Sequence, residues 1–386
     1  MNEEQFCRLC FSNDLRTSDP YDVWKTQIGL LVKNLWNKSK FLGTIPAALI
    51  TIFDQYINNR LRLFYTKQEF PIVRALAASC LLNKYEKNNN PIYLFWAKAH
   101  IDWLVNNYSK GYSGYCWGLN MDWASKNGLY GKDTPFITHT PYVLEALIRY
   151  QKLSNEDDYQ EIIKSIYKFI NIDLLKIINN EEILCLSYAP LEEPRIVINA
   201  NSYALYSLSL LFSFLPEKLI IKNDIICLFN FIASVQNKDG SWWYYHDKKA
   251  GNFIDCFHTC FILKNLIKSS RYNVLPANHT TVIERGYHYL MNNFYDEKKG
   301  LFKRYAKSDK LGLVKFDLYD NAEMLNLANL YGDTVLFNEL KHNIEKEFFK
   351  KNEIYSTIDL FNLKKNKNML RWAIMPYLNA ISSSNS

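Results

Sequence analysis

Apolar residues recur at helical spacing along most of this chain, and the segments that carry them come in pairs. From residue 71 onward, a segment of small and apolar residues is followed each time by a segment with more charge. Apolar positions at i, i+3, i+4 and i+7 predict a helix for each segment. The expected pairs cover residues 71–86 and 91–108, 140–153 and 157–170, 199–215 and 220–236, 255–268 and 280–294, and 320–330 and 334–350.

The pairs recur at an interval of roughly 50–70 residues, which is typical of helical arrays built from repeated units. A last apolar helix is expected over residues 370–381. Because the first helix of each pair is the more apolar, it should lie in an inner ring, with the more charged second helix outside it. The sequence therefore predicts an all-α fold, an (α/α)6 toroid of inner and outer helix rings.

The chain before residue 71 is expected to complete the ring. Residues 1–20 are predicted to form an irregular lead, with further helices over 21–36 and 46–64. The helix over 21–36 could supply the missing outer helix of the sixth pair. A single toroid domain is therefore expected over residues 21–386, since a repeat architecture can exceed the ~250–300 residues at which an ordinary core stops growing.

The composition is that of a globular protein with a large core, since 48% of the 386 residues are hydrophobic and 22% are charged. The N-terminus shows no basic segment followed by an apolar one, so no signal peptide is predicted. The longest apolar run, around residues 41–53, is too short to span a bilayer. Most of the eight cysteines lie in apolar helical contexts, as reduced buried thiols do. These features predict a cytoplasmic protein without a transmembrane segment.

The formal net charge of +7 is spread along the chain rather than gathered in one tract. This distribution argues against a basic arm that binds nucleic acid. It is compatible with an acidic substrate or with a weak attraction to a membrane surface.

The long loops that lead from each outer helix to the next inner helix hold the aromatic candidates for ligand binding. In a ring of helix pairs these loops emerge on one face, and loops on a rigid scaffold are where binding usually occurs. Aromatic faces suit the apolar face of a sugar ring. Trp242 is instead expected to anchor its loop to a helix. The aromatic residues expected to contact substrate in these loops are Trp117, Trp123, Trp243 and Tyr245.

Several motifs resemble those of known helical toroids. QNKDGSWW (236–243) is similar to the Q-x-x-D-G-S-W signature of squalene-cyclase-like and prenyltransferase-like toroids. About residues 15–380 resemble a bacterial family linked to surface-polysaccharide biosynthesis and named for the Vibrio protein VpsJ. The further matching segments are CWGLNMDW (116–123), THTPYVLEAL (138–147), LSYAP (186–190), INANSYAL (198–205), FIDCFHTCFILKNL (253–266), FDLYDNAE (316–323) and LRWAIMPY (370–377). The resemblance implies an (α/α)6 toroid, a role in making surface polysaccharide and polysaccharide-assembly proteins as partners.

Two groups of acidic residues stand where inner helices are expected to begin. Asp255 and His258 lie at i and i+3 on one helix face, where a carboxylate could orient an imidazole that transfers a proton. Asp317 and Asp320 also lie three residues apart, and paired carboxylates suit glycoside chemistry, with Asp317 as the catalytic candidate and Asp320 as a binding one. Each group also has a structural interpretation, because Asp is a common N-cap and favours the first turn of a helix.

Two further candidates lie in loops. Asp122 is flanked by aromatic residues and could take sugar hydroxyls or a proton, or it could simply stabilise a turn. His139 stands just before an expected inner helix, at the mouth of the ring, where it could contact substrate or remain an exposed loop residue.

The remaining candidates open inner helices. Asn199 and Asn201 stand at the start of one helix, where one of them suffices as a cap and the other could bond a ligand. Arg371 and Trp372 begin the last helix. The guanidinium of Arg371 could clamp a carboxylate or phosphate, or it could form a surface ion pair.

No metal or cofactor is expected. Cys116, Cys256 and His258 form the nearest approach to a zinc set, and they lack the adjacent Cys-His pair of the zinc-binding lanthionine-cyclase-like toroids. The sequence also lacks a Walker motif, a GxGxxG motif and the acidic DxDD motif of protonating squalene cyclases.

These patterns predict an enzyme that acts on a glycan or glycan precursor by hydrolase, lyase or epimerase chemistry. If Arg371 binds the substrate, the substrate is expected to carry an anionic group. The expected catalytic groups are Asp122, Asp255, His258 and Asp317. Two alternatives remain open at this point. One is a non-catalytic glycan-binding or scaffold protein of a polysaccharide assembly system. The other is a terpenoid or prenyl-chain enzyme, which would need an apolar central cavity.

Overall fold

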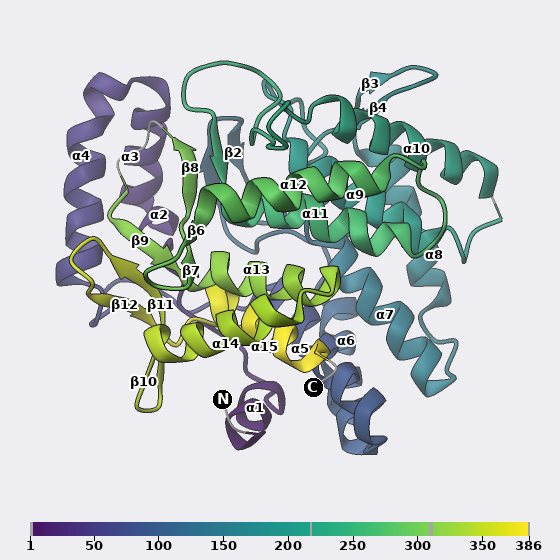
Figure 1. Cartoon of the computed structure of the whole chain (residues 1–386), viewed down its shortest axis with the longest axis horizontal. Helices are drawn as coiled ribbons and strands as arrows, with labels where there is room; N and C mark the ends of the chain where they lie inside the picture. The colour runs from purple at the N-terminus through teal and green to yellow at the C-terminus, as the bar shows by residue number, and fades with distance from the viewer. Residues whose placement is uncertain (1–2, 217, 309–311, 385–386) are drawn as a thin grey trace.

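The helices of the computed structural model, which describes residues 3–216, 218–308 and 312–384, follow one another around a closed ring. Each inner helix packs against the next, and the C-terminal helix packs back against the first, as their neighbouring positions in Figure 1 illustrate. This confirms the predicted (α/α)6 toroid. The inner helices are α5 (Pro71–Asn88), α7 (Thr140–Ser154), α9 (Ile198–Leu211), α11 (Cys256–Ser270), α13 (Leu318–Tyr331) and α15 (Met375–Ser383).

A second set of helices covers the outside of this ring, and each of them packs on the inner helix that precedes it. Burial follows the expected division, because every residue of α9 is buried whereas the outer helix α8 buries only Ile163 and Ile166. The outer helices are α6 (Pro91–Asn106), α8 (Gln160–Lys168), α10 (Lys218–Ser234), α12 (His279–Phe294) and α14 (Thr334–Phe348).

Local sequence signals fix where several of these helices begin. Asp255 and Asp317 are the N-caps of α11 and α13, and their side chains accept hydrogen bonds from the backbone N–H groups of His258 and Tyr319. Capping satisfies donors that the first helical turn leaves without a partner. The two acids are thereby held on the loop face of the ring.

The loops contain short antiparallel strands that the helical periodicity does not predict. β9 (Val314–Asp317) pairs with β11 (Glu353–Asp359), a strand far away in sequence, so local pattern carries no sign of it. The strands are too short for a clear alternation of apolar and polar residues. The others are β1 (Trp123–Ser125), β2 (Gly128–Tyr130), β3 (Lys176–Asn179), β4 (Leu184–Leu186), β5 (Phe253–Asp255), β6 (Tyr295–Asp296), β7 (Leu301–Phe302), β8 (Tyr305–Ser308), β10 (Phe349–Lys350) and β12 (Lys364–Lys367).

Two buried tryptophans anchor loops to outer helices. The indole Nε1 of Trp242 donates to the carbonyl of Ile232 in α10 at 2.9 Å, which confirms the anchoring role expected for it. Trp117 donates in the same way to Leu104 in α6, also at 2.9 Å. Trp117 is fully buried in the core, so the expectation that it contacts substrate is corrected: its ring fills space between loop and helix.

The N-terminal region differs from the expectation in two respects. The lead is not wholly irregular, because it contains α1 (Glu3–Cys10), which packs against α5. The segment expected over 21–36 forms α2 (Asp22–Lys25) and α3 (Gln27–Lys38), and α3 packs against α4 (Lys40–Ile52) and β1 rather than completing the outer ring. In Figure 1, α3 and α4 stand side by side at the edge of the molecule.

The hairpin of α3 and α4 is held together by a close helix contact. α4 begins at Lys40 rather than at Pro46, because the Ser39 side chain caps it by accepting from Leu42 N. Pro46 lies inside the helix, where it removes one backbone hydrogen bond. Gly43 lies against the backbone of Trp36, where a Cβ would come within 2.2 Å, so only glycine permits this approach. Among the described residues, no helix is both long enough and apolar enough to cross a membrane.

Candidate active site

A cleft of about 540 Å³ lies on the loop face of the toroid. This volume is within the range usual for sites that bind small molecules. Its walls come from the N-terminal ends of inner helices, from the loops before them and from the N-terminal hairpin. Nine of the predicted site residues line it, namely Trp123, His139, Asn199, Tyr245, Asp255, His258, Asp317, Arg371 and Trp372.

Asp255 and His258 form a hydrogen-bonded dyad at the start of α11. Nδ1 of the imidazole lies 2.8 Å and 2.7 Å from the two carboxylate oxygens of Asp255. The Asp255 side chain is 2% exposed and that of His258 is 20% exposed, so the acid lies beneath the ring and the ring reaches the cleft. An ionised carboxylate can only accept, which assigns the proton of a neutral imidazole to Nδ1 and leaves Nε2 as a base. Within the described part of the chain, Nε2 has no hydrogen-bond partner.

Aromatic side chains enclose this imidazole. The ring centroids of Phe257 and Tyr244 lie 4.0 Å and 4.5 Å from that of His258. Further along the cleft, Trp372 stacks on Tyr319 at 4.3 Å with an interplanar angle of 11°. These surfaces limit the access of water to the dyad and offer flat apolar faces to a ligand.

Asp317 is engaged by a cation and an indole. Arg304 Nη1 lies 2.8 Å from Asp317 Oδ2, and Trp372 Nε1 donates to the same oxygen at 3.0 Å. Burial raises the pKa of Asp317, and the charge of Arg304 opposes this rise. The second terminal nitrogen of Arg304 donates to the hydroxyl of Tyr21 at 2.9 Å. Asp317 therefore fixes Arg304 and Trp372 in the cleft wall.

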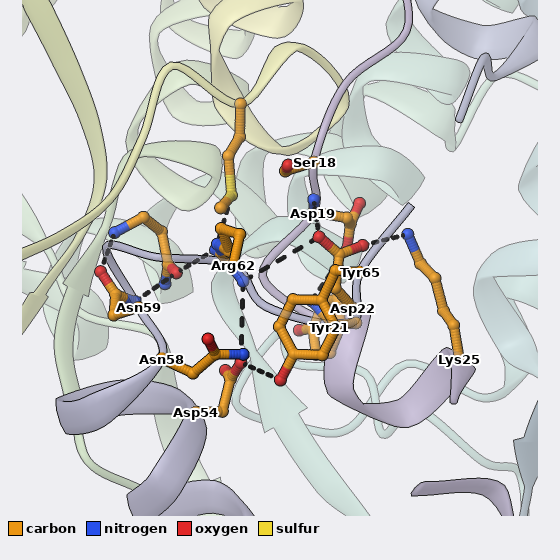
Figure 2. Close-up of polar contacts among 12 residues, drawn as sticks. Ser18, Asp19, Tyr21, Asp22, Lys25, Asp54, Asn58, Asn59, Arg62 and Tyr65 are labelled. Carbon is orange, nitrogen blue, oxygen red and sulfur yellow. Dashed lines mark hydrogen bonds and ion pairs between the residues drawn. The ribbon is translucent and has the colours of Figure 1, made fainter. Parts of the chain in front are cut away.

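Arg371 is held by a buried acid from the N-terminal lead. Its Nε donates to Asp19 Oδ2 at 2.5 Å. Burial alone would raise the pKa of Asp19, but the charges of Arg371 and Lys25 outweigh it and lower the pKa to about 2. Asp19 is joined through Asp22 to the polar network of Figure 2. Ala373, two residues after Arg371, has a φ of 133°, a strained conformation of a kind that concentrates at functional sites.

His139 and Asn199 reach the cleft from the starts of α7 and α9 with unused hydrogen-bonding atoms. Nδ1 of His139 and Oδ1 of Asn199 are buried without a partner among the described residues. Burial, assisted by Arg371, lowers the pKa of His139 to about 3, so this imidazole is neutral near pH 7. Because buried polar atoms are nearly always satisfied, these two atoms are candidates for ligand contact.

Two candidates from the aromatic loops lie outside the cleft. Asp122 is exposed and accepts a hydrogen bond from Lys132 N at 2.8 Å, so it stabilises its own loop. The expectation that it faces the cleft is corrected, because β1 directs the following residue, Trp123, inward instead. Trp243 also lies away from the cleft, where the ammonium of Lys307 approaches its ring at 6.0 Å.

Two other candidates lie beneath the cleft wall. The amide of Asn201 binds both backbone groups of Leu186, and the amide of Asn321 binds both backbone groups of Phe302 in the same way. Asn201 is thus a clamp that joins a loop to its inner helix, rather than a ligand contact. Asp320 accepts from Phe257 N at 3.0 Å and is fully buried, which raises its pKa well above the ordinary value.

Several cleft residues were not identified from the sequence. Tyr21 and Arg304 carry no motif or periodic pattern, and their places depend on a contact between segments 283 residues apart. Tyr203 and Tyr319 belong to strongly apolar helical segments, where an aromatic side chain looks like core, whereas Tyr244 lies in the aromatic loop between α10 and β5. Only the position of Tyr203 and Tyr319 near helix N-termini could have indicated those two residues.

No group of three or more His, Cys, Asp or Glu side chains in the described residues could hold a metal ion. Cys116 lies close to Ser109 O, whereas Cys256 lies 4.0 Å from Cys260, so the thiols considered for zinc occupy separate environments. All of the cysteines are free thiols, and all but Cys7 are buried.

Comparison with known proteins finds likeness in structure alone. No protein-family model matches the sequence. No curated protein matches it either. The resemblance to the VpsJ-like family therefore stays a prediction.

Solved structures of carbohydrate enzymes share the fold. A sugar epimerase from a ruminal bacterium superposes with a TM-score of 0.64 at 12% identity, over 82% of this chain and 86% of that one. A GH76 α-mannanase from Bacteroides thetaiotaomicron gives 0.60 at 12% identity, over 95% and 98%. An inactive α-1,6-mannanase variant from Salegentibacter, in which two successive Asp are replaced by Asn, gives 0.56 at 11% identity, over 81% and 88%. At these identities the likeness shows the fold.

Proposed function

We propose that this protein is a carbohydrate epimerase or isomerase, which moves a proton on a carbon atom next to a sugar carbonyl. The observation that carries the proposal is the Asp255–His258 dyad, whose Nε2 is directed into an aromatic cleft without a protein partner among the described residues. A carboxylate-oriented imidazole transfers protons near neutral pH. The likeness of fold to a sugar epimerase supports this choice of substrate class.

Four residues of the cleft have a role in this proposal. His258 Nε2 removes the proton from the carbon atom, and the electron pair of the C–H bond moves to give an enediolate. Arg371 and Arg304 stabilise the negative charge that develops on oxygen, as fixed cations in an enclosed site do. The imidazolium then returns the proton to the neighbouring carbon on the same face in isomerisation. Epimerisation requires that the enediolate first turn over in the cleft, so that the same imidazolium protonates the opposite face of the original carbon. Asp255 positions the imidazole and stabilises its charged form.

Hydrolysis is less well supported by the cleft. The carboxylates that line it in the described structure are Asp54, Asp255 and Asp317, and each is already bound to a Tyr, His or Arg side chain. The one pair of successive Asp residues in the sequence, Asp157 and Asp158, lies between α7 and α8, outside the cleft. A hydrolase needs a carboxylic acid free to protonate the leaving group.

A terpenoid or prenyl-chain substrate also fits poorly. The cleft is bordered by His139, Arg304 and Arg371 as well as by the dyad. A hydrocarbon would leave His139 Nδ1, Asn199 Oδ1 and Arg304 Nε unsatisfied, since these buried atoms have no partner among the described residues, and this is costly. A sugar offers hydroxyl groups to each of them.

The substrate proposed is a sugar, or a glycan precursor with an anionic group, used in surface-polysaccharide biosynthesis in the cytoplasm. Arg304 and Arg371 support an anionic group through the guanidinium nitrogens that their pairs with Asp317 and Asp19 leave unused, since guanidinium binds carboxylate and phosphate well. The pathway and any assembly partners are supported by the sequence motifs alone.

A product screen tests the reaction class. The full chain is incubated with a panel of reducing sugars, uronic acids and sugar phosphates, with α-1,6-mannan included, and products are identified by NMR. An epimer or a ketose, formed by the wild type and lost in His258→Gln, supports the proposal. New reducing ends from the mannan would instead support a hydrolase. Saturable binding of a sugar without turnover across the panel would support the non-catalytic binding module.

A further inference from the structure

The N-terminal hairpin presents a continuous apolar surface to solvent. In Figure 1, α3 and α4 lie side by side with α4 at the outer edge of the molecule. On each helix the exposed apolar positions follow a helical repeat, so they form one face. Soluble proteins rarely expose apolar patches of this extent without a function. We call this surface the hairpin face, and its main side chains are Ile28, Leu31, Leu35, Phe41, Ile45 and Leu49.

The exposure of this face is large for aromatic and aliphatic residues. Phe41 is 90% exposed and Ile45 is 70% exposed. The apolar surface continues past η1 (Phe53–Ile57) to Phe64, which is 88% exposed. Its sequence signature is the apolar run around residues 41–53, which is too short to span a bilayer.

The charges around the hairpin face are positive. Between residues 26 and 68 the only acid is Asp54, and it is buried, where it accepts from the Tyr65 hydroxyl at 2.7 Å and lies 3.7 Å from Arg62. Figure 2 shows this network, in which Asp22 is likewise bound to Lys25 at 2.7 Å. The exposed charged residues of the segment are Lys38, Lys40, Arg60 and Lys67.

A basic hollow of about 290 Å³ adjoins the tip of the hairpin. Its charged lining residues in the described structure are the basic residues Lys40, Lys126, Arg195 and Lys249, of which Arg195 is already paired with Asp247. A lipid phosphate has the charge that such a hollow favours. Apolar and basic features thus occur together at one end of the hairpin.

We propose that the hairpin face docks this protein on an anionic lipid bilayer, with its apolar side chains at the boundary between headgroups and acyl chains. Amphipathic helices with basic margins bind membranes in this way. α4 has 13 residues, which corresponds to about 20 Å of helix. This is shorter than the ~30 Å hydrocarbon core, so the hairpin lies in the interface rather than spanning it.

A second copy of the chain is a poorer partner for this face. Two copies joined by this face would bring its basic surroundings, including Lys38 and Arg60, together without exposed acids from the segment 26–68 to offset them, and like charges oppose association. An anionic bilayer meets both requirements, since it covers apolar side chains and neutralises basic ones. The same hairpin contributes Lys33 and Trp36 to the cleft wall, so docking would hold the cleft near the lipid headgroups.

Vesicle binding by the full chain tests this proposal. Sedimentation with vesicles of phosphatidylcholine containing 30% phosphatidylglycerol, a composition of about one anionic lipid in three, should capture the protein. Capture should fall when salt is raised from 0.1 to 0.5 M, because screening weakens the basic contacts. Phe41→Ser/Leu49→Ser should weaken binding about tenfold or more, since two large apolar side chains no longer enter the interface.

Matched controls distinguish docking through the hairpin face from non-specific binding of exposed apolar residues to vesicles. Leu219 and Ile220 on α10 are 83% and 58% exposed, and Leu219→Ser/Ile220→Ser should bind vesicles as the wild type does. Unchanged melting temperatures would show that both variants are folded. The proposal is overturned if the wild type ignores anionic vesicles, if the control loses binding equally, or if light scattering shows a dimer that Phe41→Ser/Leu49→Ser dissociates.

Discussion

The chemistry proposed for the cleft depends on which ring nitrogen of His258 carries the proton. Both carboxylate oxygens of Asp255 lie within 2.8 Å of Nδ1, so this nitrogen is the donor. Nε2 is thereby left as a base toward the cleft. The arrangement is fixed within one helical turn, because the residue that caps α11 also orients the imidazole.

Asp255→Asn should lower kcat by about 10²- to 10⁴-fold, a loss of the size usual for an acid/base group. An amide can present either a donor or an acceptor to Nδ1, so the tautomer is no longer fixed and the imidazolium loses its counter-charge. The measurement is turnover on whichever sugar the product screen identifies. Asp122→Asn, on the surface outside the cleft, is the matched control and should keep wild-type kcat.

His139 should make folding less stable in mild acid. Its pKa is about 3 in the folded protein against an ordinary 6.5, so below pH 6.5 the unfolded chain binds a proton that the folded chain cannot. The free energy of unfolding therefore falls by about 1.4 kcal/mol per pH unit from pH 6.5 downward, or about 2 kcal/mol by pH 5. Above pH 6.5 this contribution is constant.

Urea unfolding at pH 7.5 and pH 5 measures this effect. The stability lost between the two values should be about 2 kcal/mol smaller for His139→Gln than for the wild type. His246 is exposed, so His246→Gln serves as the control. Its free energy of unfolding should fall between pH 7.5 and pH 5 by as much as that of the wild type. Equal losses in wild type and His139→Gln would contradict the burial of a neutral imidazole at this position.

Sequence patterns could locate the dyad but not all of its surroundings. Asp255 and His258 could be identified from the sequence because both fall in the first turn of one helix, where spacing alone decides which side chains meet. Arg304 could not be identified in this way, because its position depends on Tyr21, which lies 283 residues away in the sequence. Trp117 and Asp122 were misplaced because an aromatic loop can pack on its own helix as readily as it can face a ligand.

At the scale of elements, inner helices are joined by buried charges as well as by apolar packing. Lys264 of α11 and Glu323 of α13 form an ion pair whose side chains are nearly fully buried. Lys264→Met should reduce the free energy of unfolding by about 3–5 kcal/mol, because Glu323 would be left as an unpaired buried charge. Denaturant unfolding measures this change.

The double variant Lys264→Met/Glu323→Leu is the informative comparison. Replacing both members of a buried pair by apolar residues is often neutral or stabilising. It should therefore be more stable than Lys264→Met alone. A double variant as unstable as the single one would show that packing, rather than charge, holds this contact.

The loop anchor of α10 gives a second prediction at this scale. Trp242→Phe removes the indole N–H and leaves the carbonyl of Ile232 without that donor. The expected cost is about 1–3 kcal/mol in the free energy of unfolding, measured by urea titration. Trp243→Phe, at the neighbouring position outside the core, should cost much less, and equal costs would contradict the anchor.

Helices were the predictable elements, because a 3.6-residue repeat over more than ten residues is a strong signal. The strands could not be predicted, because strand pairing depends on tertiary contact, as in the pairing of β9 with β11. The start of α4 was missed because Pro46 suggests a helix N-terminus, whereas the Ser39 cap places the start earlier.

At the scale of the whole molecule, the two ends of the chain meet at the cleft. Asp19 holds Arg371, and the Thr17 hydroxyl accepts from the backbone N–H of Leu370 at 2.9 Å. The N-terminal lead therefore belongs to the site rather than preceding it. Ring closure by α15 was predictable from repeat spacing, but the use of residues 3–64 as a wall and a hairpin was not, since nothing periodic links them to the pairs.

The central claim is that His258, oriented by Asp255, transfers a proton on a sugar carbon. The most direct measurement is deuterium incorporation into a sugar substrate incubated with the full chain in D2O and followed by NMR and mass spectrometry. We predict one deuterium at the carbon next to the carbonyl, formed by the wild type and absent with His258→Gln. Equal turnover by His258→Gln, or equal deuterium incorporation by His258→Gln, would contradict the account.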